Sequence, residues 1–176
     1  MSRKIIFATG NEGKMREIRA ILADLGAEIL SMKEAGIEIE IDENGSTFEE
    51  NARIKAEAVA KYCGNDIVLA EDTPYEIKNQ KLIERLEGVP REQRTARFVC
   101  AICAVIPGHE PVTVRGTIEG YIGWEPAGEN GFGYDPIFYV PDLECSTAQL
   151  SMEEKNKRSH RGNALRKIKE ELVSYI

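Results

Sequence analysis

The chain opens with a strand signal that passes directly into a helix signal, and this order constrains the fold more than any other feature. Residues Lys4–Thr9 form a largely apolar run that is typical of a buried strand. From Lys14 to Leu25 the apolar residues recur at helical spacing, and Gly26 is placed to end that helix. Because a buried strand followed by an amphipathic helix favours a sheet covered by helices, the opening predicts an α/β fold.

The rest of the chain continues with strand and helix signals and shows no internal repeat, low-complexity segment or domain boundary. Further strands are predicted at 27–32, 37–41, 66–72, 95–106 and 112–122. Further helices are predicted at 48–63, 79–86 and 160–173, with a short one opened by Ser151. The Gly- and Pro-rich run 123–141 contains aromatic residues, so we expect an ordered loop. Residues 1–176 are therefore predicted to form a single domain.

Composition and charge exclude several classes of protein. The 176 residues are 42% hydrophobic and 30% charged, which is ordinary for a globular domain. A net charge of −7 argues against a surface that coats nucleic acid, although a few convergent cations suffice for a small anionic substrate. Apolar runs such as Phe98–Pro107 are too short to span a bilayer, and no signal-peptide core follows the N-terminus. We therefore expect a cytoplasmic protein without a membrane or nucleic-acid partner.

Two of the four cysteines, Cys100 and Cys103, have the spacing of some metal and redox motifs. They lie inside a predicted strand, where positions three apart point to opposite faces of the sheet. They are therefore not expected to share a metal or form a disulfide. We predict that the cysteines are buried, reduced and structural.

The first candidate site is the turn between the first strand and the first helix. Backbone N–H groups at a helix start, the positive end of its dipole and a lysine together suit a phosphate group. The turn is not a Walker A loop, because only two residues separate its first glycine from Gly-Lys. An ordinary turn with a helix cap is the alternative, and both interpretations are open. The residues concerned are Thr9, Gly10, Asn11, Glu12, Gly13 and Lys14.

Three carboxylates are candidates for metal binding and acid–base chemistry. Glu50 lies three residues after Thr47, which is the spacing of a capping box, so it either closes a helix cap or supplies an oxygen to Mg²⁺. Glu71 and Asp72 end an apolar strand, at the edge of the sheet where α/β proteins bind ligands. One carboxylate on a metal and a neighbour that orients water would suit phosphoanhydride hydrolysis, whereas a solvated strand end is the alternative.

Two later segments are candidates for recognising a base and phosphates. In the segment Gly131–Pro136, Phe132 or Tyr134 would stack on a nucleobase, or else the aromatic rings fill the core. Near the C-terminus, Lys155, His160 and Arg161 would donate to phosphates or to a base carbonyl, or else they form a solvated basic face.

These motifs follow one another in a distinctive order. The chain contains Thr-Gly-Asn-x-x-Lys, Thr-Phe-x-Glu-Asn-Ala with a later Lys-Ala, a strand ending in Glu-Asp, Gly-Phe-Gly-Tyr-Asp-Pro-Ile-Phe, and Glu-Lys-Asn followed by Ser-His-Arg-Gly. Over nearly its whole length it closely resembles the inosine/xanthosine triphosphate pyrophosphatase family. The resemblance implies a mixed α/β fold with a long, bent central sheet flanked by helices, and two lobes with an active-site cleft between them.

The resemblance also implies an activity and residue roles. The expected reaction is Mg²⁺-dependent hydrolysis of ITP, dITP and XTP to the monophosphate and pyrophosphate, which removes deaminated purines from the nucleotide pool. Glu50 and Asp72 would hold Mg²⁺, and Asp72, Glu71 and Lys14 would be catalytic. The implied substrate-binding residues are Thr9, Gly10, Asn11, Glu12, Gly13, Lys14, Thr73, Phe132, Gly133, Tyr134, Asp135, Lys155, His160 and Arg161. A homodimer is also implied.

The chain departs from the family pattern directly after Thr73. The family continues there with a glycine-containing stretch, whereas here Pro74–Lys78 runs almost directly into the next helix. On the order of two dozen residues are missing, comparable with a strand and a long loop. Either the chain is a natural or engineered short form, or a segment of the protein is absent from this sequence. The resemblance implies that this region contributes to the family's dimer contact. Two alternatives are a nucleotide-binding module that has lost turnover, and a pyrophosphatase acting on other modified nucleotides.

Overall fold

A computed structural model of the chain describes residues 3–72 and 79–176. Its centre is one seven-stranded sheet with the order β2-β1-β3-β4-β5-β6-β7. The first three strands of that order are parallel and the later pairs are antiparallel, so the sheet is mixed, as predicted. The strands are β1 (Lys4–Phe7), β2 (Glu28–Ser31), β3 (Ile67–Asp72), β4 (Thr95–Val105), β5 (Val112–Ile122), β6 (Phe138–Val140) and β7 (Cys145–Ser146).

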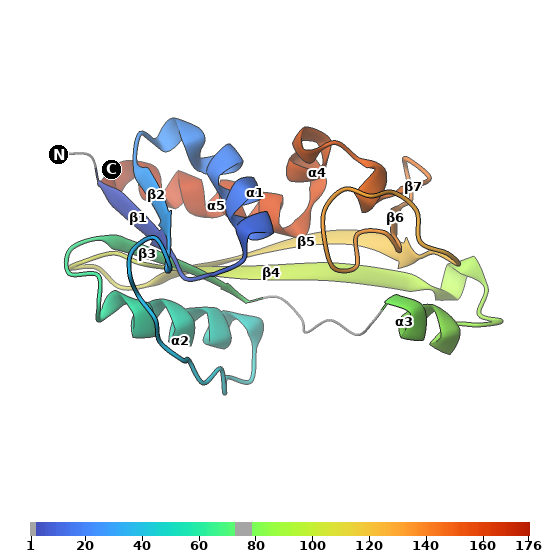
Figure 1. The fold of residues 1–176 in the computed structure, drawn as a ribbon, viewed down its shortest axis with the longest axis horizontal. Helices are drawn as coiled ribbons and strands as arrows, with labels where there is room; N and C mark the ends of the chain where they lie inside the picture. Colours follow the sequence, from blue (N-terminus) through green and yellow to red (C-terminus); the bar gives the residue numbers. More distant parts are fainter. Residues whose placement is uncertain (1–2, 73–78) are drawn as a thin grey trace.

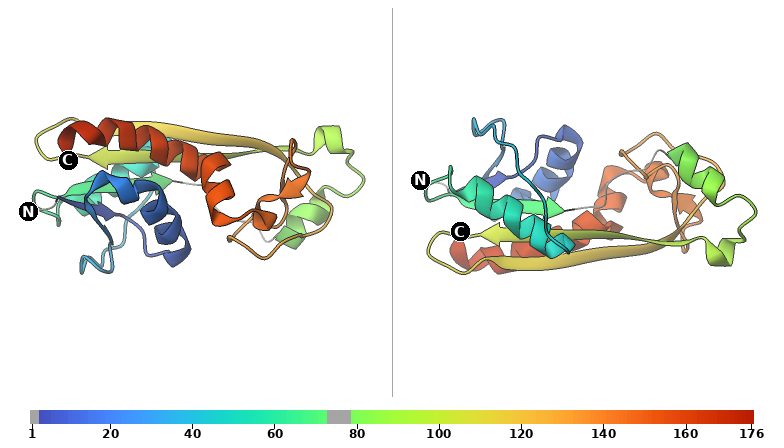
Figure 2. Two further views of the ribbon diagram at one scale, coloured as in Figure 1. Left: turned by 90° about the horizontal axis from the view of Figure 1, so that it is seen from above. Right: turned by 90° about the horizontal axis from the view of Figure 1, so that it is seen from below.

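Helices cover both faces of the sheet, as Figures 1 and 2 show. The helices are α1 (Glu12–Leu22), α2 (Phe48–Ala60), α3 (Asn79–Arg85), α4 (Met152–Arg158) and α5 (His160–Leu172). Side chains of α1 and α5 share one apolar cluster with β1, β3 and β4. Side chains of α2 share a second cluster with the opposite faces of the same strands. The α/β layering that the opening of the sequence predicts is therefore confirmed.

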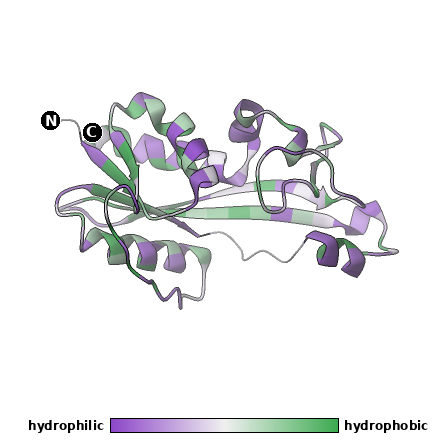
Figure 3. Cartoon of the chain, viewed as in Figure 1, coloured by the Kyte–Doolittle hydropathy of each residue, from purple (hydrophilic) through white to green (hydrophobic). Residues whose placement is uncertain are grey.

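The long hairpin of β4 and β5 connects two lobes (Figure 1). One lobe holds β1–β3 with α1, α2 and α5, and the other holds β6, β7 and α3. The second lobe has its own apolar cluster, which includes Ile118, Ile137 and Phe138. In Figure 3 the strands of the first lobe are largely hydrophobic, whereas α3 is mostly hydrophilic, which fits its lack of buried residues.

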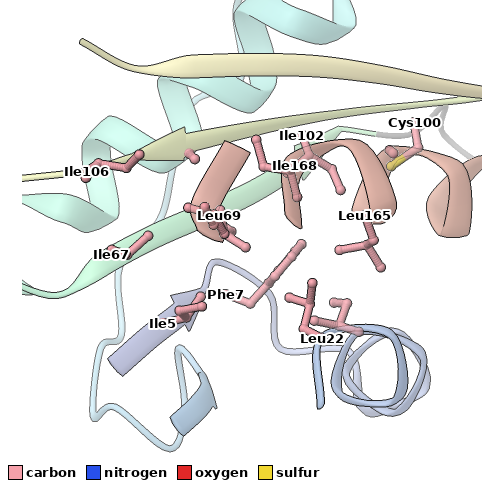
Figure 4. Close-up of a cluster of buried hydrophobic side chains, with 14 of the residues drawn as sticks. Ile5, Phe7, Leu22, Ile67, Leu69, Cys100, Ile102, Ile106, Leu165 and Ile168 are labelled. Carbon is pink, nitrogen blue, oxygen red and sulfur yellow. The ribbon is translucent and has the colours of Figure 1, made fainter. Parts of the chain in front are cut away.

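The core of the first lobe holds the ends of β1 and β3 beside α5. Figure 4 shows Phe7 of β1 and Leu69 of β3 directed toward Leu165 and Ile168 of α5. All four side chains are fully buried, and each such burial contributes about 1.5–3 kcal/mol. This packing fixes where the two strands end, and therefore where the candidate site residues that follow them lie.

Helix α5 lies unusually close to β5 because Gly116 has no side chain. A Cβ atom at Gly116 would lie 2.2 Å from the carbonyl oxygen of His160 and 2.3 Å from the backbone nitrogen of Ala164. Both neighbours are backbone atoms of α5, so they cannot move aside as a flexible side chain would. Glycine at this position therefore allows the N-terminal part of α5 to pack directly against β5.

Several predicted elements differ from the observed ones. Residues 37–41 are predicted as a strand but form none. Ile37, Ile39 and Ile41 instead join the apolar cluster of α2. The alternation of apolar and polar residues here therefore reflects burial of one side of a segment that pairs with no strand in the described part of the chain. The run 123–141, predicted as a loop, contains β6. Helix α1 begins at Glu12 and continues after Leu22 as a short 3₁₀ turn.

The cysteine prediction is largely confirmed. Cys100 and Cys103 belong to the clusters on opposite faces of the sheet. All four cysteines are free, and Cys63 is also buried, but Cys145 is only partly buried. Within residues 3–72 and 79–176, no helix has the length and apolar character to cross a membrane.

Candidate active site

The turn between β1 and α1 is organised by its own side chains. The Asn11 side-chain oxygen accepts a hydrogen bond of 3.0 Å from the Lys14 N–H, so Asn11 is the helix cap. The Thr9 hydroxyl accepts the Asn11 N–H at 3.2 Å. A Cβ atom at Gly10 would meet no atom of residues 3–72 or 79–176 within 4 Å, so these residues leave space open at the helix start. The capping interpretation is thus confirmed for Asn11, and it leaves the start of α1 accessible to an anion.

Glu71, at the end of β3, is a buried carboxylate held between two cations. Its oxygens lie 2.8 Å from Lys14 Nζ and accept hydrogen bonds of 2.8 and 3.1 Å from Arg161. The side chain is 3% exposed. Burial by itself raises the pKa of Glu71, but the charges of Arg161 and Lys14 and their hydrogen bonds lower it well below its usual range. Glu71 is therefore ionised at neutral pH.

Arg161 and Lys155 extend this cluster through a second buried carboxylate, Glu17 of α1. Arg161 Nη1 donates to Glu17 at 2.8 Å, and Lys155 Nζ donates to Glu17 and to Asp135 at 2.6 Å each. The result is a row of side chains with alternating charge, which we call the alternating ion-pair network. Its members, in order of contact, are Lys14, Glu71, Arg161, Glu17, Lys155 and Asp135.

This alternating ion-pair network joins the two lobes. Lys14 and Glu17 come from α1 in the first lobe, whereas Asp135 comes from the loop that precedes β6. Buried charges are tolerated only when they are paired, and here every buried member has at least one partner of opposite charge. The network therefore fixes the loop of the second lobe against α1.

Phe132 covers this network beside a pocket. Its ring centroid lies 4.8 Å from Lys155 Nζ and 5.3 Å from the Arg161 guanidinium, which are cation–π distances. Its N–H donates to Asp135 at 2.8 Å, and a Cβ atom at Gly13 would lie 3.1 Å from the ring. The pocket of about 430 Å³ is lined from both lobes, by residues that include Gly13, Arg16 and Glu17 of α1, Asn130–Phe132 of the loop, and Lys155. This volume is within the range of small-molecule sites.

The other candidate carboxylates lie where α2 begins and β3 ends. The exposed Glu50 accepts the Ser46 N–H at 2.6 Å, and the Thr47 hydroxyl accepts the Glu50 N–H at 3.1 Å. Thr47 therefore caps α2 as predicted, but Glu50 bonds the N–H of Ser46 and not that of Thr47, so among the described residues only half of the predicted capping box is formed. Asp72 accepts a hydrogen bond of 3.1 Å from Asn51. In the part of the chain that the structure describes, no group of three or more His, Cys, Asp or Glu residues is placed to hold a metal ion.

The residue types of Glu50 and Asp72 nevertheless suit Mg²⁺. This ion prefers hard carboxylate oxygens, needs only one or two of them from the protein, and takes waters and substrate phosphates as its remaining ligands. A set of three protein ligands is therefore not required. Glu50 and Asp72 are the residues that would hold the ion.

The remaining predicted site residues have mixed environments. His160 packs edge-to-face on Phe98 with ring centroids 5.0 Å apart, and its buried Nδ1 has no hydrogen-bond partner among residues 3–72 and 79–176. Burial, and next the charge of Arg161, lower the pKa of His160 to about 3, so the ring is neutral. Tyr134 joins the apolar cluster of the second lobe, as the core-filling alternative predicts. The Gly133 carbonyl accepts the Asn79 side chain at 3.0 Å. Thr73 lies outside the described residues.

Sequence reasoning missed three residues that contact the site. Glu17 bridges Arg161 and Lys155, Asn51 holds Asp72, and Lys55 donates to the Glu71 carbonyl at 3.1 Å. A signal for Glu17 was present, because a carboxylate on the apolar side of a helix needs a buried partner. The other two follow Glu50 on the same helix, where spacing alone does not reveal a partner on β3.

A family model described as the Ham1 family matches residues 5–78 and 73–171. The chain belongs to the Ham1 family. A curated relative from Bacillus licheniformis, named dITP/XTP pyrophosphatase, is 46% identical over 189 residues and is matched over 94% of this chain and 96% of its own length. A relative of the same name from Bacillus subtilis is 45% identical, with 94% and 95% covered.

Solved structures of Ham1 proteins agree with this assignment. The Staphylococcus aureus Ham1 protein is 35% identical and superposes with a TM-score of 0.82, covering 99% of this chain and all of its own. A HAM1 protein from Coxiella burnetii is 36% identical with a TM-score of 0.83, covering 98% and 99%. The resemblance and the fold class expected from the motifs are therefore confirmed.

The Ham1 alignments also bear on the region after β3. The two blocks of the family match meet at residues 73–78. The alignment with the Bacillus licheniformis relative runs over 189 positions, more than the 176 residues of this chain. That relative therefore has positions without a counterpart here.

Proposed function

We propose that this Ham1-family chain hydrolyses non-standard purine nucleoside triphosphates, namely ITP, dITP and XTP, to the nucleoside monophosphate and pyrophosphate. The observation that carries the proposal is the alternating ion-pair network, which sets Lys14 and the Glu71–Asp72 pair on one side and Phe132 with a pocket on the other. Two of its relatives bear the name dITP/XTP pyrophosphatase. In this proposal the chain would remove deaminated purines from the nucleotide pool.

The triphosphate would lie at the start of α1. The open space at Gly10, the N–H groups of the first helical turn and the Lys14 ammonium all favour an anion there. The base would lie in the pocket beside Phe132, where an aromatic face supports stacking worth about 1–3 kcal/mol. Residues of both lobes would thus bind one substrate.

Bond cleavage would occur between the α- and β-phosphates. In this proposal a water attacks the α-phosphorus, Asp72 accepts the proton of that water, and pyrophosphate leaves with the bonding electrons. Glu71 is already bound to Lys14 and Arg161, so it would position these cations and would not touch the water. A Mg²⁺ ion held by Glu50 and Asp72 would offset the negative charge of the phosphates.

Selection of the base would depend on a donor facing its 6-position. Lys155, which lines the pocket, Arg161, which lies against the Phe132 ring, or a backbone N–H would pair with the 6-oxygen of hypoxanthine or xanthine. Adenine presents a 6-amino group, so donor would meet donor and a buried polar group would be left unpaired, at a cost of about 1–3 kcal/mol. ATP would therefore be a poor substrate.

The test is incubation with ITP and MgCl₂, with product identification and GTP and ATP in parallel. We expect inosine monophosphate and pyrophosphate. Asp72→Asn should lose turnover by a factor of about 10²–10⁴, as expected for a general base. Asp142→Asn, which changes an exposed aspartate paired with Arg158, is the matched control and should retain full turnover. Orthophosphate as the product, or parental turnover by Asp72→Asn, would refute the assignment; binding of ITP without product would instead select a binding module.

We also propose that residues 1–176 act as one shortened pyrophosphatase domain in the cytoplasm, and that it forms a homodimer as the family resemblance implies. The alignment that exceeds the length of the chain supports the shortening. Static light scattering tests the oligomer: a monomer mass of 19.7 kDa would remove the dimer from the proposal.

A further inference from the structure

Asn51 links the two residues that would hold Mg²⁺, although they come from different elements. Glu50 is in the first turn of α2 and Asp72 is the last residue of β3. The Asn51 amide nitrogen donates to Asp72 Oδ2 at 3.1 Å, and the Asn51 side-chain oxygen accepts the Gly45 N–H at 2.8 Å. Both ends of this amide are therefore in use, which fixes its orientation.

The same turn that holds Asn51 also holds Glu50. The N–H of Ser46, next to Gly45, donates to Glu50 Oε2 at 2.6 Å. A Cβ atom at Gly45 would lie 2.7 Å from both the Asn51 side-chain oxygen and Glu50 Cβ, so the turn packs directly on these two side chains. Consecutive backbone N–H groups thus orient Glu50 and Asn51 together, and Asn51 in turn orients Asp72.

We propose that Asn51 is a positioning residue that fixes the Asp72 carboxylate relative to Glu50 and thereby sets the divalent-cation affinity of the pair. The inference rests on the proposed function only in taking these two carboxylates as the metal ligands. Hydrogen-bond partners that orient metal ligands typically change metal affinity or activity by about 10–100-fold when they are removed. A residue that merely stabilised α2 would change the unfolding midpoint and leave cation affinity unchanged.

The experiment measures cation binding directly, in the absence of nucleotide. Mn²⁺ alone is titrated into the full chain, and free Mn²⁺ is followed by electron paramagnetic resonance. We expect Asn51→Ala to weaken Mn²⁺ binding about tenfold. Asn163→Ala is the matched control, because it removes another half-buried amide, one that donates to the Thr117 carbonyl on β5. The control should bind Mn²⁺ within about twofold of the parent.

A double-variant cycle separates positioning from a general structural effect. If Asn51 acts through Asp72, then Asn51→Ala should cause no further loss of Mn²⁺ binding once Asp72→Ala is present. Equal losses with and without Asp72 would overturn the inference. Circular dichroism verifies the fold of each variant. If Asn51→Ala does not fold, Asn51→Ser replaces it, because the serine side chain is too short to retain the hydrogen bond to Asp72.

Turnover distinguishes this inference from the proposed function. If the parent hydrolyses ITP but Asn51→Ala binds Mn²⁺ like the parent, the role of Asn51 is wrong and the proposed function stands. If the parent has no turnover but Asn51→Ala weakens Mn²⁺ binding through Asp72, the proposed function fails and the role of Asn51 stands. A parent that binds no Mn²⁺ at millimolar concentration would overturn the role of Asn51.

Discussion

His160 provides a quantitative prediction for stability in acid. Its ring packs on Phe98, and none of the residues that the structure describes bonds its Nδ1. Burial, and next the charge of Arg161, lower its pKa from 6.5 to about 3. Between these two values the unfolded chain binds a proton at this side chain and the folded chain does not. Stability therefore rises with pH in this window, and it falls as pH decreases below 6.5.

The magnitude follows from the two pKa values. At pH 8 His160 is neutral in both states and contributes no pH dependence. At pH 5 protonation favours the unfolded state by a factor of about 30, which corresponds to about 2 kcal/mol. His160→Phe keeps an aromatic ring against Phe98 but cannot titrate, so it should not lose this amount.

Urea unfolding at 25 °C, followed by circular dichroism at pH 5, 6, 7 and 8, measures the effect. The quantity of interest is the unfolding free energy of the parent minus that of His160→Phe, because contributions of the carboxylates cancel in this difference. It should fall by about 2 kcal/mol from pH 8 to pH 5.

A difference for His160→Phe that stays constant within about 0.5 kcal/mol over this range would refute the reasoning. It would mean that His160 gains a proton as readily in the folded chain as in the unfolded one. The opposite trend, with the parent gaining stability in acid relative to the variant, would mean that a carboxylate stabilises the charged ring.

Three further predictions concern other parts of the structure. Gly116→Ala should lower stability by about 3 kcal/mol or more in urea unfolding, because its Cβ would overlap the backbone of α5, whereas Gly10→Ala, with open space around it, should cost less than about 1 kcal/mol. Arg161→Met removes one partner of the buried Glu71 carboxylate and should lower the free energy of unfolding by about 3–5 kcal/mol. Arg97→Met breaks an exposed ion pair and should lower it by at most about 1 kcal/mol. Similar losses of stability in the two variants would refute the burial argument. Lys167→Ala uncovers the backbone carbonyl of Arg115 on β5 and should increase self-association of the chain. Light scattering over a concentration series measures this effect, and unchanged scattering would show that Lys167 does not protect this strand.

Local features of the site were predictable from the sequence. The cap of α1 by Asn11 and the bond between Thr47 and Glu50 depend on residues three positions apart. Such contacts form within one turn of a helix, so spacing alone specifies them. The placement of Cys100 and Cys103 on opposite faces follows from strand geometry in the same way.

Local pattern failed where more than one packing satisfies it. The alternation at Ile37, Ile39 and Ile41 predicts a strand, but these side chains pack into the cluster of α2 without strand pairing. Periodicity reports which side of a segment is buried, and it does not report whether a neighbouring strand offers hydrogen bonds. Phe132 and Tyr134 illustrate the same limit, since one borders the pocket and the other fills the core of the second lobe.

The sequence by itself determined the order of the motifs, the caps of helices α1 and α2 and the residue types available for phosphate and metal chemistry. Only the tertiary structure decided which of them meet. Glu17 contacts Lys155 and Arg161, which lie 138 and 144 residues further along the chain, and a Gly13 without a side chain admits the Phe132 ring. Burial of a charge requires a partner but does not name it, so the pairing is fixed by the packing of α1 against α4 and α5.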